Sequence, residues 1–166
     1  MVLGRLDRSG RGVGRRAQTV PSWPWWLGLS GLLPQLACVA VLWLGPQEWR
    51  YVALAVAWGY AALIFSFLGG LWWGIAAAAD TRGVRPPAWL WLVSVVPSLV
   101  ALAAYLPWVF GLDWPGPSLA LLGLGILLSL VVDWRITGRE APDWWFRLRA
   151  PLSGGLGLAT LLVAIA

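Results

Sequence analysis

The residues able to do chemistry are few, and three carboxylates stand close together in the chain. Asp133, Glu140 and Asp143 lie in one segment among four arginines, Arg135, Arg139, Arg147 and Arg149. A guanidinium matches a carboxylate in charge and geometry, so such neighbours readily form ion pairs. We therefore interpret these charges as ion pairs that orient a surface helix, and we expect no catalytic residue.

The rest of the composition excludes several kinds of site. The chain of 166 residues has no histidine and one cysteine, Cys38. Histidine-ligated haem, a cysteine/histidine zinc site, an iron–sulfur cluster and an internal disulfide all need ligands or partners that this chain lacks. A serine nucleophile would need a base, and none is near a serine in sequence or membrane depth. We expect no metal, no cofactor and no enzymatic activity.

The elements that must position these residues are membrane-spanning helices. Sixty per cent of the residues are hydrophobic and 11% are charged, which is outside the range of soluble domains. Five apolar runs predict an all-α bundle of five transmembrane helices at residues 25–44, 51–79, 88–110, 118–132 and 152–166. Residues 1–22 are basic and predict a disordered tail, and residues 23–166 predict the transmembrane domain.

The arginines predict the orientation of the bundle. All twelve basic residues are arginines, and with five spans eleven of them fall on one side. Cytoplasmic loops are rich in basic residues, so we expect a cytoplasmic N-terminus and an external C-terminus. The arginines cluster between the apolar runs, which also argues against nucleic-acid binding. The stretch "PDWWFRLRAP" before the last span alternates aromatic residues and arginines, which predicts a segment lying in the headgroup plane.

The second apolar run carries a stripe of small residues at intervals of four. The stripe comprises Ala62, Ser66, Gly70, Gly74 and Ala78. In lipid, small residues let helix backbones approach closely, and Gly70 and Gly74 form a GxxxG motif. We expect the stripe to pack against one of the protein's own helices. The alternative is a groove for a partner subunit, a lipid tail or an apolar ligand.

Fifteen tryptophans are distributed along the chain, and most of them stand at the ends of predicted spans. The interfacial aromatic belt explains those. Trp58, Trp72 and Trp73 lie deeper and are the candidate contacts for a ligand or a partner. At the membrane interface, Asp133 stands where the fourth predicted span ends, and Arg149 stands just before the fifth begins. We predict that these two residues form an interfacial ion pair.

Three stretches together resemble a known family. "SFLGGLWWG", Asp133 and "PDWWFRLRAPLS" are similar to motifs of small five-helix membrane proteins of unknown function, a family shared by bacterial proteins and the animal mitochondrial transmembrane protein 69. The matching positions include Phe67 to Gly70, Trp73-Gly74, and Pro142, Trp144, Leu148 and Arg149. The resemblance implies a membrane location and this fold, and no activity. Trp72 stands where the family pattern has a polar residue, so we expect no polar role there.

These observations lead to two hypotheses about function. The first is a multi-pass protein of a bacterial inner membrane that is non-enzymatic and assembles or stabilises another membrane protein or itself. The second is a protein that binds or transports a lipid or small apolar molecule through the groove on the second helix. Membrane lipids are expected partners in both. A bacterial source is inferred from an arginine-, alanine- and glycine-rich composition that suggests GC-rich coding.

Overall fold

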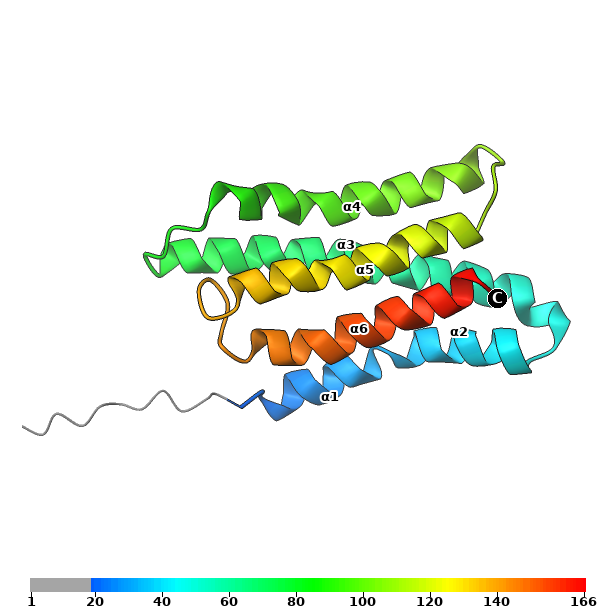
Figure 1. The fold of residues 1–166 in the computed structure, drawn as a ribbon, viewed down its shortest axis with the longest axis horizontal. Helices are drawn as coiled ribbons and strands as arrows, with labels where there is room; N and C mark the ends of the chain where they lie inside the picture. Colours follow the sequence, from blue (N-terminus) through cyan, green and yellow to red (C-terminus); the bar gives the residue numbers. More distant parts are fainter. Residues whose placement is uncertain (1–18) are drawn as a thin grey trace, which may run out of the picture.

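The regular structure is helical throughout the part of the chain that is described. The computed structural model describes residues 19–166. Its elements are α1 (Ser22–Ser30), α2 (Leu33–Leu44), a short 3-10 helix η1 (Gln47–Trp49), α3 (Arg50–Thr81), α4 (Ala88–Val109), α5 (Gly116–Ile136) and α6 (Trp145–Ala164) (Figure 1). The predicted all-α class is confirmed. The predicted disordered tail falls mainly on residues 1–18, outside the described residues.

Among residues 19–166, four helical segments are long and apolar enough to cross a membrane. They are Ser22–Leu44, Gln47–Thr81, Ala88–Val109 and Gly116–Ile136. Helix α6 is not one of them, since its first turns carry Arg147 and Arg149. Its axis nevertheless runs alongside the other helices, between α5 and the α1–α2 pair (Figure 1). The chain is a multi-pass membrane protein.

Helix α3 lies at the centre of the packing. Its buried side includes Ala53, Ala57 and Ala61, followed by the larger Phe65 and Leu68. Phe65 and Leu68 form a core cluster with residues of α4, α5 and α6: Ala104, Leu122, Ile126 and Leu156. Because lipid is as apolar as these side chains, the cluster is held by close packing more than by exclusion of water.

The first predicted span is two helices, not one. The helix predicted over residues 25–44 breaks between Ser30 and Leu33. Pro34, in the first turn of α2, has no N–H to donate and its ring would clash with the carbonyl four residues back. The hydroxyl of Tyr60 on α3 donates to the carbonyl of Gly31, which helps to satisfy the backbone at the break.

A polar contact joins α2 to α6 in the apolar interior. Gln35 is fully buried, and its Nε2 donates to Thr160 Oγ1 at 3.0 Å. Thr160 in turn donates to the carbonyl of Leu156 on its own helix. Such contacts hold helices together where burial of apolar surface drives little association.

The helices at the fourth and fifth predicted spans extend beyond the predicted bounds, and most of the segment predicted to precede the last span is part of its helix. Helix α5 continues through Asp133 to Ile136, and α6 begins at Trp145 instead of residue 152. Residues 145–150 are thus the first turns of α6, with Leu148 and Arg149 buried. The charges did not end the helices because Asp133 and Arg149 neutralise each other inside the bundle.

The small-residue stripe does not form the expected close helix crossing. Gly70, Gly74 and Ala78 are exposed, and a Cβ added at either glycine would meet no atom within 4 Å. The close approach is at Gly69, where a Cβ would lie 2.2 Å from the Ser94 carbonyl oxygen of α4. Adjacent helical residues point about 100° apart. The large residues of α3 turn it so that Gly69, and not the stripe, faces α4.

The remaining members of the stripe have different surroundings. Ser66 lies at the edge of the α3–α4 contact, and its Oγ is 2.8 Å from Ser98 Oγ. Ala62 is half-buried against the central core cluster. The stripe is therefore not a single surface in this fold: its first half borders α4, and its second half is uncovered.

Candidate functional site

A buried carboxylate joins three helices near one end of the bundle. Asp133 on α5 has no exposed surface. Its Oδ1 accepts hydrogen bonds from Trp72 Nε1 of α3 and Trp145 Nε1 of α6, each at 2.9 Å. Its Oδ2 accepts from Arg149 Nε of α6 at 3.0 Å. Charge-assisted bonds of this kind are short and strong, so this cluster fixes the three helices relative to each other.

The arginine of the cluster is held on its other side as well. Arg149 Nη2 donates to Ser153 Oγ at 2.5 Å, and both residues are buried. They also line a cavity of about 200 Å³ between α1, α3 and α6. Because both carboxylate oxygens of Asp133 already accept hydrogen bonds, the group is poorly placed to act as a base. The arrangement of Asp133, Trp72, Trp145, Arg149 and Ser153 is suited to holding the helices together, and this cluster is called the clamp below.

Sequence reasoning found part of this clamp. The structure places Asp133 and Arg149 together, as the predicted ion pair requires. The expectation that position 72 has no polar role is wrong, since the indole N–H of Trp72 donates a hydrogen bond to Asp133. Trp145 and Ser153 were missed. Their signal was present, because positions 145, 149 and 153 repeat at four residues and share one helix face.

The three deep tryptophans do not form one site. Trp72 is buried in the clamp. Trp73 is half exposed and packs edge-to-face on Trp91, with ring centroids 5.0 Å apart. Trp58 lies in a separate aromatic cluster, 5.6 Å from the Tyr105 ring and 6.1 Å from the Trp114 ring. A single ligand pocket lined by all three is not present in the described fold.

An apolar groove lies on the seam between α4 and α5. It encloses about 360 Å³, and α3 forms its floor with Phe65 and Trp72. The walls are aliphatic, with Val93, Val96, Pro97 and Val100 from α4, and Leu121, Leu124, Leu128 and Val132 from α5. Gly125 shapes it: a Cβ there would lie 2.7 Å from the Phe65 ring, so only glycine leaves room for that ring in the floor.

Neither feature offers a metal site. Among residues 19–166 there is no group of three histidine, cysteine, aspartate or glutamate side chains placed to hold a metal ion. The groove offers an elongated apolar surface, and the clamp offers rigid support beneath it, since Trp72 belongs to both.

Comparison with known proteins gives a family and one curated relative. A family model described as "Protein of unknown function (DUF3429)" matches residues 20–165. Transmembrane protein 69 of Xenopus tropicalis is 34% identical over 129 residues, which cover 77% of this chain and 48% of that protein. The chain thus spans about half the length of this relative. No solved structure matches the chain.

Proposed function

Because the chain belongs to the DUF3429 family of proteins of unknown function, as its motifs predicted, we propose a role from its own geometry: it is a non-enzymatic membrane protein that holds a lipid chain in the α4–α5 groove. The groove is the single observation that carries this proposal. Lipid binding is the second of the two hypotheses raised by the sequence. The sequence placed it on the glycine face of α3, and we now propose it for the seam between α4 and α5.

The dimensions of the groove support an acyl chain as its occupant. Its α5 wall runs from Leu121 to Val132, eleven residue-to-residue steps that rise about 16 Å at about 1.5 Å each. One leaflet is half of a hydrocarbon core of about 30 Å, or about 15 Å. The groove therefore has the length of one leaflet. Pro97 and Gly125 keep side-chain bulk low along it, which leaves room for a chain between the helices.

The experiment is purification in a mild detergent followed by mass spectrometry of the lipids that remain bound. Val96→Trp should fill the groove and lower the bound lipid per protein about tenfold, or about 1.4 kcal/mol of binding free energy. Val95→Trp is the matched control, because Val95 is 44% exposed against 46% for Val96 and does not line the groove. Equal lipid retention by both variants would exclude the groove as the binding site.

A second candidate is the interaction or assembly role inferred from the sequence. The observation that favours it is the uncovered half of the stripe, where Gly70, Gly74 and Ala78 are exposed on α3. Another membrane helix, from a partner protein or a second copy, could approach closely there. A stable partner that co-purifies with the native chain and is lost with Gly74→Leu would support this role over lipid binding.

We further propose five spans, a cytoplasmic N-terminus and an external C-terminus in a bacterial inner membrane. Helix α6 has 20 residues, about 30 Å at about 1.5 Å each, enough for a fifth span. The α3–α4 and α5–α6 loops lie at one end of the bundle (Figure 1), and these loops with the adjoining turns of α5 and α6 hold six of the seven arginines in residues 19–166. Arg82 Nη2 of the first loop donates to the Glu140 carbonyl of the second at 2.8 Å.

A further inference from the structure

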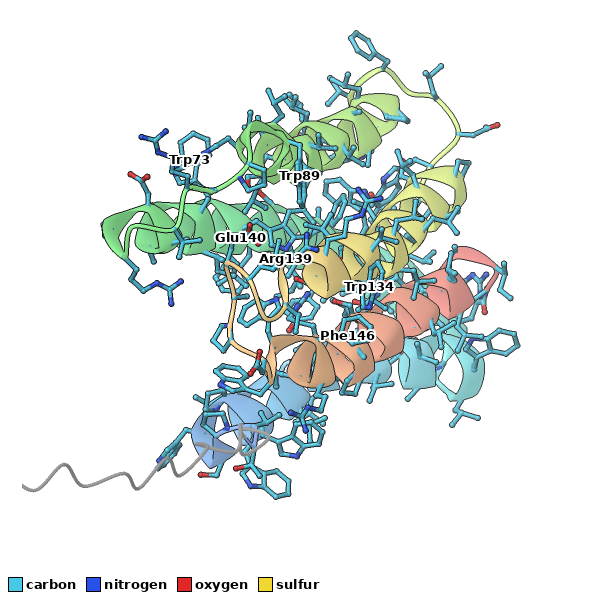
Figure 2. The ribbon with its side chains drawn as sticks, turned by 60° about the vertical axis from the view of Figure 1, so that its left-hand side comes forward. Trp73, Trp89, Trp134, Arg139, Glu140 and Phe146 are labelled. Atoms are coloured by element: carbon cyan, nitrogen blue, oxygen red, sulfur yellow. The ribbon has the colours of Figure 1, made fainter. Side chains whose placement is uncertain are left out.

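A cavity rich in arginine and tryptophan lies where α4 begins and α5 ends. It encloses about 500 Å³ and is lined by Trp89, Trp134, Arg135, Thr137 and Arg139. Figure 2 shows Trp89, Trp134 and Arg139 at this end of the bundle, beside the loop that joins α5 to α6. Indoles and guanidinium groups in such a place meet the headgroup layer of a membrane.

This cavity continues the seam that forms the acyl groove. The groove ends at Val132 on α5 and at Val93 on α4. Arg135 follows Val132 by three residues, and Trp89 precedes Val93 by four, so each helix carries the lining of the cavity one turn beyond the groove. A single amphiphilic molecule lying along the seam would place its chain in the groove and its polar end in the cavity.

The two arginines of the cavity are available for an anion. Arg135 and Arg139 are exposed, and the buried ion pair between Asp133 and Arg149 involves neither of them. The carboxylate next in sequence, Glu140, is buried and does not line the cavity. Asp143 lines a neighbouring cavity that Arg139 also borders. Arg135 does not border that cavity. The net charge facing the cavity is therefore positive.

Selectivity must come from this polar end. Lipid tails are all as apolar as the valines and leucines of the groove, so the groove by itself distinguishes lipids poorly. We propose that the cavity binds the phosphate of an anionic phospholipid, with Arg135 and Arg139 as its donors and the Trp89 and Trp134 rings against the rest of the headgroup. This inference rests on the proposed acyl groove and names the class of lipid that the groove holds. Arginine donates to phosphate in a fixed fork and suits such a site.

The test compares two lipids that share acyl chains and differ in headgroup. Native mass spectrometry of the full chain in mild detergent would measure binding of dioleoyl phosphatidylglycerol and of dioleoyl phosphatidylcholine. We expect the native protein to prefer phosphatidylglycerol about tenfold. Arg135→Gln and Arg139→Gln should each lower that preference, and the double variant should abolish it while one lipid stays bound. Both side chains are exposed, so an unchanged melting temperature is expected and is measured alongside.

Arg85→Gln is the control for general charge. Arg85 is exposed in the α3–α4 loop at the same end of the bundle and does not line the cavity. Equal binding of the two lipids by the native protein would overturn the inference, as would an equal loss of preference with Arg85→Gln. In both cases the groove remains as proposed. Unchanged lipid binding by Val96→Trp would instead refute the groove as the lipid site, and the headgroup inference that rests on it would fail as well.

Discussion

Replacing Asp133 by asparagine tests whether the buried clamp is an ion pair that the fold depends on. Asparagine keeps an oxygen that can accept from the Trp72 and Trp145 indoles, both of which donate to Oδ1. Its amide nitrogen then faces Arg149 Nε, which is also a donor, at the position where Oδ2 accepts at 3.0 Å. The substitution therefore removes one charge-assisted hydrogen bond and leaves a buried guanidinium without a counter-charge.

The expected cost follows from these contacts. A hydrogen bond to a charged group contributes about 1.5–3 kcal/mol, and breaking a buried pair by removing one partner costs about 3–5 kcal/mol. We expect about 3 kcal/mol for Asp133→Asn and a similar loss for Arg149→Gln. The double variant has no unpaired charge, so it should lose about 3–4 kcal/mol, and the coupling should be about 2–3 kcal/mol. Neutral polar pairs between membrane helices couple by only about 0.6 kcal/mol on average, so the two cases can be told apart.

The assay is reversible unfolding in mixed micelles of a mild and a denaturing detergent, for the native chain, both single variants and the double variant. The control cycle combines Asp133→Asn with Ser118→Ala. Ser118 is buried on the same helix, and its Oγ has no hydrogen-bond partner. It stands fifteen residues away, about 22 Å along the axis, so that cycle should be additive within about 0.5 kcal/mol. Losses for Asp133 and Arg149 that are equally additive would refute the ion-pair reasoning.

Two further predictions concern packing and orientation. Gly69→Ala should destabilise the protein by about 1–3 kcal/mol, because its Cβ would lie 2.2 Å from the Ser94 carbonyl oxygen, whereas Gly70→Ala should change stability by less than about 0.5 kcal/mol. Thermal unfolding in detergent checks this, and similar losses at both glycines would contradict the described rotation of α3. Alkaline phosphatase fused after Ala166 should be active and the same enzyme fused after Arg139 inactive; the reverse pattern would invert the proposed topology.

The helices themselves were predictable because their causes are local. A run of about twenty apolar residues must satisfy its own backbone hydrogen bonds in lipid, and only a helix does so within one segment. The runs near residues 51–79 and 88–110 became α3 and α4 with ends within two residues of those predicted. The prediction failed where a charge was taken as a helix end. Asp133 and Arg149 lie inside helices because each supplies the other's counter-charge, which is information from two places in the chain.

By itself, the sequence determined the all-helical class, the membrane location and the pairing of the buried aspartate with an arginine. The tertiary structure decided which face of each helix is covered. Composition shows that α3 has small residues, but Gly69 packs tightly and Gly70 does not because the burial of Phe65, Leu68 and Trp72 turns the helix. The α4–α5 groove arises in the same way. No single segment encodes this groove. Residues of α3, α4 and α5 all line it, so it exists only because α4 and α5 pack on α3 with a space between them.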